Sequence, residues 1–264
     1  MTDSNTIALL GATGQTGRQT LEQLLQKPDV NVHVYVRSKS KLLQQSPSVA
    51  GSSRVKICEG AVTDVTTIKA CVRGAGVIIS TLGGNDNRPM TVIKDALTSL
   101  VSALAQLRQE TKGTWQKPLV LMLSSSTWNK RNMAQMPSLL HFVIHRAFWY
   151  PYVDVLAGHG ILEGAGDLLK PLLVQPPLLV DDTPTGYELS TEKVGLSIAY
   201  EDLGGAFTEL ATNQQYWDLG AVMPFSRGGD QPSRYAPIIV GRVSRGLLAS
   251  YVPGFWAVCD RLFG

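Results

Sequence analysis

The stretch Gly11-Ala12-Thr13-Gly14-Gln15-Thr16-Gly17 decides the fold of this chain of 264 residues. It follows the apolar run Thr6–Leu10, which predicts a buried strand, and it opens Gly17–Gln26, where leucines recur at helical spacing. Glycines in a turn between a strand and a helix let the main chain approach a bound pyrophosphate, and the start of the helix offers it free N–H groups. The stretch therefore predicts a dinucleotide-binding site at the start of the first helix.

Strand-like and helix-like patterns keep alternating after this motif. Such alternation predicts an α/β fold, a Rossmann-type doubly wound parallel sheet with helices on both faces. The further strands expected are Val30–Val36, Val55–Cys58, Val77–Ser80, Leu119–Leu123 and Leu172–Val174, and the further helices are Val65–Val72, Thr91–Arg108 and Ser138–Leu162, the last broken at Pro151.

The last third of the chain is less regular. Its patterns predict short strands near Tyr187 and at Tyr216–Val222, a helix at Asp202–Ala211 and a Gly/Pro-rich loop at Pro224–Pro237. We expect a single NADP(H)-binding domain over 1–264, with the nucleotide-binding core at 1–180 and a substrate-side region with a C-terminal cover at 181–264.

The end of the second expected strand indicates which dinucleotide binds. Arg37 and Ser38 follow this strand, with Lys41 just beyond, where sites that prefer NAD carry Asp or Glu for the ribose hydroxyl. A guanidinium, a hydroxyl and a lysine suit a 2′-phosphate by charge and geometry. We therefore expect NADP(H); the alternative is a solvated basic turn.

Composition excludes several classes of partner. The net charge of +3 is small and no basic run is interleaved with aromatic residues, so we expect no nucleic acid. No apolar run is long enough to span a membrane, and Ile238–Phe263 is interrupted by polar and charged residues, so we expect a packed segment over a pocket, with membrane-surface contact as the alternative. Three cysteines without a CxxC spacing indicate reduced thiols in the cytoplasm. His141 and His145 stand four apart but have no third ligand, so we expect no metal.

Five strings carry a family resemblance: GATGQTG at 11–17, VRS at 36–38, STLGG at 80–84, SSSTWN at 124–129 and VQPP at 174–177. Over residues 6 to about 220 the chain resembles the atypical short-chain dehydrogenase/reductases, in particular the NmrA-like group. The resemblance implies that Thr81, Leu82 and Gly83 lie along the diphosphate and nicotinamide, Ser124 and Ser125 near the nicotinamide ribose, and Gln175, Pro176 and Pro177 beside the ring. Ala61 stands where the family often has Asp, which leaves the adenine contact to the main chain or Val62.

The catalytic pair of ordinary family members is missing. They use a tyrosine with a lysine one helical turn later, but here Tyr152 is followed by Leu156. The catalytic candidates are then Asp154 for a cationic substrate, Arg131 for a carbonyl oxygen, and Ser125 and Tyr152. The alternatives are a solvated helix carboxylate for Asp154 and a plain surface charge for Arg131. Substrate-stacking side chains are expected from Trp128, Phe255 and Trp256.

Two functions fit these observations. The site resembles that of fungal NmrA-like proteins of indole-alkaloid pathways, which implies an NADPH-dependent enzyme of secondary metabolism acting on a bulky, flat small molecule. Such an enzyme would reduce a C=N (iminium) or C=O bond, or template a Diels–Alder or Pictet–Spengler cyclisation. The rival is a non-enzymatic redox sensor of the NmrA type that reports to a protein partner. The missing tyrosine–lysine pair favours the rival, and the apolar tail favours the enzyme; the oligomeric state is left open.

Overall fold

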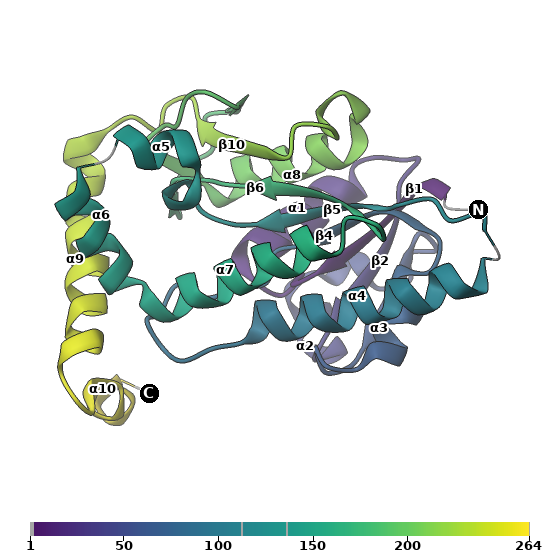
Figure 1. The fold of residues 1–264 in the computed structure, drawn as a ribbon, viewed down its shortest axis with the longest axis horizontal. Helices are drawn as coiled ribbons and strands as arrows, with labels where there is room; N and C mark the ends of the chain where they lie inside the picture. Colours follow the sequence, from purple (N-terminus) through teal and green to yellow (C-terminus); the bar gives the residue numbers. More distant parts are fainter. Residues whose placement is uncertain (1–2, 112, 136, 264) are drawn as a thin grey trace.

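A computed structural model describes residues 3–111, 113–135 and 137–263 (Figure 1). The strands are β1 (Asp3–Leu10), β2 (Asn31–Val36), β3 (Val55–Glu59), β4 (Ala75–Ser80), β5 (Leu119–Leu123), β6 (Lys170–Val174), β7 (Leu178–Val180), β8 (Tyr187–Ser190), β9 (Ser197–Ala199) and β10 (Ala221–Ser226). Eight of them form one sheet in the order β3-β2-β1-β4-β5-β6-β10-β8, with β8 antiparallel to β10 and the other pairs parallel. The short strands β7 and β9 form a separate parallel pair.

The chain has helices on both faces of the large sheet and beside it. They are α1 (Gln15–Leu25), α2 (Lys39–Gln45), α3 (Val65–Val72), α4 (Val92–Glu110), α5 (Lys130–Gln135), α6 (Ser138–Ala147), α7 (Trp149–Gly164), α8 (Tyr200–Thr212), α9 (Pro232–Tyr251) and α10 (Phe255–Phe263). Successive side chains of a strand point to opposite faces, so Ile7 and Leu9 of β1 join a core with α1 and α8. Ala8 and Leu10 join the opposite core, with α3, α4 and α7. The predicted Rossmann-type fold is confirmed.

The strand order places the ligand site. From β1 the chain moves outward to β2 and β3, then returns to the other side of β1 as β4. At such a reversal the connections leave in opposite directions and open a crevice at the carboxyl ends of the strands, which is where α/β proteins bind ligands. The loop 11–14 after β1 and the loop after β4 both begin at this crevice.

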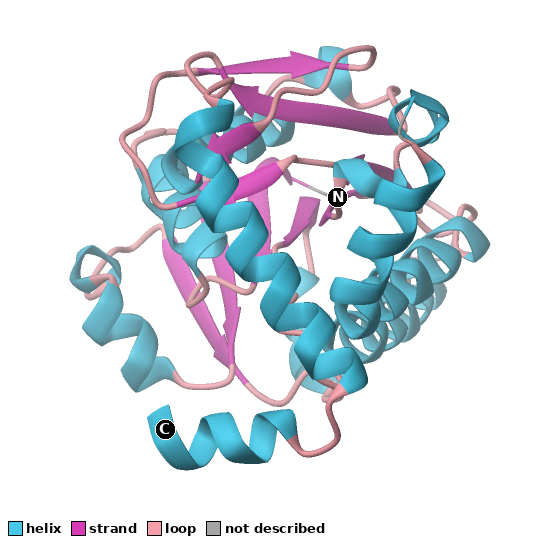
Figure 2. Cartoon of the chain, turned by 90° about the vertical axis from the view of Figure 1, so that its left-hand side faces the viewer, coloured by secondary structure: helices cyan, strands magenta, loops and turns pink. Residues whose placement is uncertain are grey.

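The helices α6, α9 and α10 stand beside the sheet, at the left in Figure 1, and Figure 2 views the protein from that side. Helices α6 and α9 touch backbone to backbone, since a Cβ at Gly246 would overlap the carbonyl oxygen of Ala147. The buried Asn87 joins them to α7: its Nδ2 donates to the Gly246 oxygen at 3.0 Å, and its Oδ1 accepts from the Tyr150 N–H at 3.0 Å.

Some predicted boundaries are wrong, and proline explains most of them. The break in the helical region lies at Phe148, because Pro151 fits the first turn of α7, where the missing N–H leaves no hydrogen bond unmade. The expected loop Pro224–Pro237 is shorter and covers 227–231, because β10 extends to Ser226 and α9 begins at Pro232. The strand expected at Tyr216–Val222 begins only at Ala221, and α2 was not predicted. The division into one domain with a core at 1–180 stays a prediction.

Candidate functional site

A cavity of about 600 Å³ opens at the carboxyl ends of β1, β4, β5 and β6. It brings together side chains and main chain from loops far apart in the sequence, as the strand order requires. Among the predicted residues, those that line it are Gly14, Gln15, Thr16, Thr81, Leu82, Gly83, Ser124, Ser125, Tyr152, Pro176 and Pro177. The loop at 11–17, named the phosphate loop here for its predicted role, and two of the four catalytic candidates therefore line the same cavity.

The loop at 11–17 has the geometry that a pyrophosphate needs. Gly11 has φ +96°, which favours glycine, and a Cβ on Gly17 would overlap the Gly11 carbonyl oxygen. Gly14 caps α1 without a side-chain hydrogen bond, and the first turn of α1 holds no acidic residue. The N–H groups and the positive dipole end of α1 are thus open to an anion, which fits a dinucleotide's phosphates.

Hydroxyl groups form a chain on the wall of the cavity. Ser125 Oγ donates to Thr127 Oγ1 at 3.2 Å, and Thr127 Oγ1 shares a hydrogen bond of 3.0 Å with the phenol oxygen of Tyr152. Ser125 lies just after β5 and Tyr152 in the first turn of α7, so the two elements bring the hydroxyls together. Burial raises the pKa of Tyr152, and its hydrogen bonds to Thr127 and Ser125 oppose that effect. The phenol is therefore protonated at neutral pH.

A second polar pair lies further along α7. Ser124 Oγ, on the cavity wall, and His159 Nε2 are 2.9 Å apart. Burial lowers the pKa of His159, so its imidazole is neutral at pH 7 and can accept a hydrogen bond from the Ser124 hydroxyl. His159 stands seven residues after Tyr152, two helical turns along the same face. That spacing is the sequence signal that could have identified it.

Residues 11–214 match the protein family described as NAD(P)H-binding. The chain belongs to this family. Its curated relatives include oxidoreductase nsrR of Aspergillus novofumigatus, 32% identical over 79% of each chain. Averufin oxidase A of Aspergillus flavus is 33% identical over 82% of this chain and 81% of its own. A short-chain dehydrogenase/reductase (wide type) of Veillonella parvula, solved in complex with NADP, shares the fold with a TM-score of 0.66 at 17% identity, covering 86% of this chain and 97% of that one.

The family match confirms the predicted relationship to Rossmann-type NAD(P)-binding proteins and the predicted nicotinamide dinucleotide cofactor, and the preference for NADP(H) is tested below at Arg37. Within the described ranges, no helix is long and apolar enough to cross a membrane. Over the same ranges, no group of three His, Cys, Asp or Glu side chains is placed to hold a metal ion.

The residues predicted to contact the adenosine half of the cofactor lie outside the cavity. Arg37 is exposed at the end of β2, and Lys41 is exposed on α2. The Ser38 hydroxyl accepts the Lys41 N–H at 3.2 Å and so caps α2. Val62 is half-buried in the loop after β3. The roles of these four residues stay predictions.

Two residues expected at the cofactor also make hydrogen bonds within the scaffold, and their roles at the cofactor stay predictions. Gln175 is buried outside the cavity lining, and its Oε1 accepts from Asn129 Nδ2 at 2.9 Å. Thr81 lines the cavity, but its hydroxyl donates to the Leu10 carbonyl at 3.1 Å and thereby ties β4 to β1. Gly11, Thr13 and Gly17 shape the loop without lining the cavity.

Asp154 does not face the cavity as expected. It is 2% exposed, and its two carboxylate oxygens accept the N–H groups of Ile93 and Lys94, each at 2.9 Å. These donors lie in the first turn of α4, where backbone N–H groups lack a helical partner and a negative charge is favourable. The carboxylate expected to hold a cationic substrate is a cap for another helix.

Replacing Asp154 with alanine should therefore lower the free energy of unfolding by about 2–4 kcal/mol, because the N–H groups of Ile93 and Lys94 lose the acceptor supplied by this buried carboxyl group. Urea denaturation measures the loss. The exposed Asp181 gives the control, since Asp181→Ala should change stability by less than about 0.5 kcal/mol. Normal stability of the Asp154→Ala variant together with lost turnover would return Asp154 to a catalytic role.

Four other predicted site residues lie outside the cavity lining, and their roles stay predictions. The Arg131 side chain is 63% exposed and pairs with Glu192 at 3.5 Å, away from the cavity. Trp128 packs edge-on against Tyr152 with ring centres 5.4 Å apart, but it does not line the cavity. Phe255 and Trp256 lie on α10, where the Trp256 Nε1 donates to the Asn87 carbonyl at 2.8 Å.

The cover of the cavity comes from α9 and α6. Ile239, Arg242 and Val243 of α9 face it, with Leu140 and Ile144 of α6. The sequence predicted that the tail Ile238–Phe263 would cover a pocket, and the part of it that lines the cavity is the stretch 239–243 of α9. Arg242, the one charged residue among those that line the cavity in the described ranges, was not predicted.

Proposed function

We propose that the chain is an NADP(H)-dependent oxidoreductase of secondary metabolism that reduces a carbonyl group of a flat, mostly apolar small molecule. The observation that carries this proposal is the hydroxyl chain Ser125–Thr127–Tyr152, which opens on the same cavity as the phosphate loop. The names of fungal relatives, oxidoreductase nsrR and averufin oxidase A, support redox chemistry.

The bound reduced cofactor would supply a hydride to the carbonyl carbon. As the carbonyl π electrons move to oxygen, Tyr152 donates its phenolic proton to that oxygen and the product is an alcohol. Thr127 and Ser125 orient the phenol and stabilise the phenolate until it takes a proton from solvent. The phenol is within one hydrogen-bonded network of the cavity, so it can pass its proton to a developing alkoxide there.

The charge of the cavity favours C=O over C=N reduction. In the described ranges its lining includes no Asp or Glu, and its one charged side chain is the cation Arg242. A cationic iminium would meet an unfavourable field there, whereas a neutral or anionic substrate would not. Templated cyclisation of a bulky substrate is the second use of such a cavity. The redox-sensor alternative is less favoured, because a sensor has no need of apolar space beside a hydroxyl chain.

Transfer of deuterium tests the proposal. Protein would be incubated with NADPH carrying deuterium at the transferable position and with a panel of aromatic ketones, and products would be analysed by mass spectrometry. We expect one deuterium on the carbinol carbon for each NADPH oxidised. Saturable NADPH binding without label transfer to any ketone would favour the sensor, and a new ring formed without NADPH consumption would favour the cyclase.

The preference for NADP(H) is tested at Arg37. Removing its guanidinium with Arg37→Ala should weaken NADPH binding about tenfold or more and NADH binding by less than about twofold, because only NADPH carries the 2′-phosphate. Calorimetry with both cofactors measures this. Arg108→Ala, which removes an exposed arginine from the far end of α4, is the control. Equal losses for the two cofactors would contradict the assignment.

A further inference from the structure

Arg242 is unusual among the residues that form the cavity. Its neighbours on the wall include Leu178, Leu179, Ile239 and Val243, all apolar. A cation among apolar side chains is costly unless a partner compensates for the lost water. The partner that the structure gives is a main-chain carbonyl: Arg242 Nη1 donates to the Leu179 oxygen at 2.9 Å. The remaining N–H groups of the guanidinium fork are available to a ligand.

The other arginines of α9 are different. Arg234 pairs with Asp182 at 2.6 Å, and Arg245 lies 3.9 Å from Asp86. Arg242 makes no ion pair with any Asp or Glu in the described ranges. Its charge is the one on this helix that faces the cavity and has no protein counter-ion.

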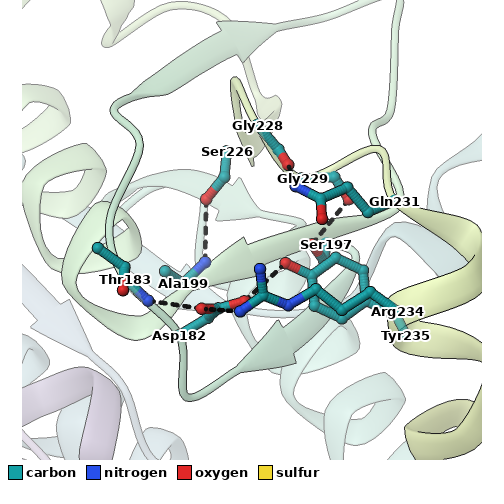
Figure 3. A network of polar contacts seen from close by, with 10 residues as sticks. All are labelled: Asp182, Thr183, Ser197, Ala199, Ser226, Gly228, Gly229, Gln231, Arg234 and Tyr235. Carbon is teal, nitrogen blue, oxygen red and sulfur yellow. Dashed lines mark hydrogen bonds and ion pairs between the residues drawn. The ribbon is translucent and has the colours of Figure 1, made fainter.

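The fold also holds Arg242 firmly in place. Near the start of α9, Asp182 accepts hydrogen bonds from the Arg234 guanidinium and from the Tyr235 phenol, at 2.6 Å and 2.9 Å (Figure 3). Arg242 comes seven residues after Tyr235. Four residues after Arg242, Gly246 lies against the backbone of Ala147. An arginine between two such anchors is a preorganised anion site, because little side-chain and helix entropy is left to lose on binding.

We propose that Arg242 binds an acidic oxygen of the substrate, a phenolate or a carboxylate on an aromatic ring system, and so selects the substrate class. This inference rests on the proposed function, since it places a substrate in the same cavity. The apolar wall would hold the rings, and the guanidinium would take the anionic oxygen in a charge-assisted hydrogen bond. The sequence suggested Arg131 as the arginine that binds a substrate oxygen, and this proposal gives that part to Arg242.

A matched pair of probes tests the inference without turnover. 2-Hydroxy-1,4-naphthoquinone is an anion at neutral pH, and 2-methoxy-1,4-naphthoquinone has the same rings without the charge. Calorimetry would measure the binding of each to protein saturated with NADP⁺. We expect the wild type to bind the anion about tenfold more tightly or better, and Arg242→Gln to reduce that ratio to within about twofold. Arg242→Lys should keep part of the preference, since it keeps the charge without the fork.

The control is Arg245→Gln, which removes a neighbouring arginine that already has Asp86 nearby and should keep the full preference. The thermal midpoint and NADPH affinity of Arg242→Gln show whether its fold and cofactor site are intact. A wild type without preference for the anion, or an Arg242→Gln variant that keeps the preference, overturns the inference. So does a tenfold loss of NADPH affinity, about 1.4 kcal/mol, which would make the cofactor the anion that Arg242 binds. Label transfer to neutral ketones is independent of each of these outcomes, so the proposed reaction can stand if the inference fails.

Discussion

Replacing Gly17 with alanine should abolish useful NADPH binding, with an affinity loss of about 100-fold or more. The added Cβ would overlap the carbonyl oxygen of Gly11 and lie 2.7 Å from Thr81 Oγ1. The loop must move away from α1 to make room, and the N–H groups that would hold the phosphates move with it. We also expect a fall of about 1–3 kcal/mol in the free energy of unfolding, since the site is already tightly packed. Calorimetry with NADPH and urea denaturation measure the two effects.

The same substitution elsewhere is the control. Gly160 lies inside α7, and a Cβ there would meet no atom within 4 Å. Gly160→Ala should leave NADPH binding unchanged and raise stability by about 0.5–1 kcal/mol, because alanine loses less backbone entropy than glycine in a helix. A Gly17→Ala variant whose affinity stays within about tenfold of the wild type would contradict the assignment of the phosphate loop.

Replacing Tyr152 with phenylalanine should lower kcat for carbonyl reduction about 100-fold or more, while KM changes little. The ring remains, so the packing against Trp128 is kept and the loss is confined to the proton donor and its hydrogen bond to Thr127. Steady-state kinetics with a ketone that takes up the label provides the measurement.

The pH profile gives a second reading of the same residue. The donor acts in its protonated form, so activity is lost as the pH rises through its pKa. Because burial raises that pKa above the ordinary tyrosine value of 10.0, the wild type should keep its kcat through neutral and mildly alkaline pH. Tyr150→Phe, which changes a phenol that is 38% exposed, should behave as the wild type. A Tyr152→Phe variant within about threefold of wild-type kcat would remove the phenol from the mechanism.

The first part of the fold could be predicted because its signals are local. The apolar run, the glycine turn and the leucine spacing at 6–26 each depend on neighbours within a few residues, and the structure places β1 and α1 there. Further along the chain, two prolines are compatible with both a loop and a helix. Pro151 and Pro232 are compatible with the first turn of a helix, and the sequence does not show where that turn begins.

The site was harder to predict because it is built by contacts far apart in the chain. Asp154 was expected to face a ligand, but it binds N–H groups at 93 and 94, about 60 residues earlier. Arg242 reaches the cavity because α9 is positioned by Asp182, Asn87 and Ala147. No periodicity within residues 232–251 indicates those partners. Tyr152 was identified correctly as a cavity residue because it lies on the helix that carries the catalytic tyrosine in the family resemblance.

The crossing of Gly246 and Ala147 has a consequence for the range of molecules that the protein can accept. Helices α6 and α9 each contribute side chains to the same wall of the cavity, so their close approach at this crossing helps to shape that wall. A methyl group at the crossing would overlap the Ala147 carbonyl oxygen, so the two helices would have to shift and the side chains on the wall would shift with them. The shape of the cavity thus depends partly on Gly246, which does not line the cavity.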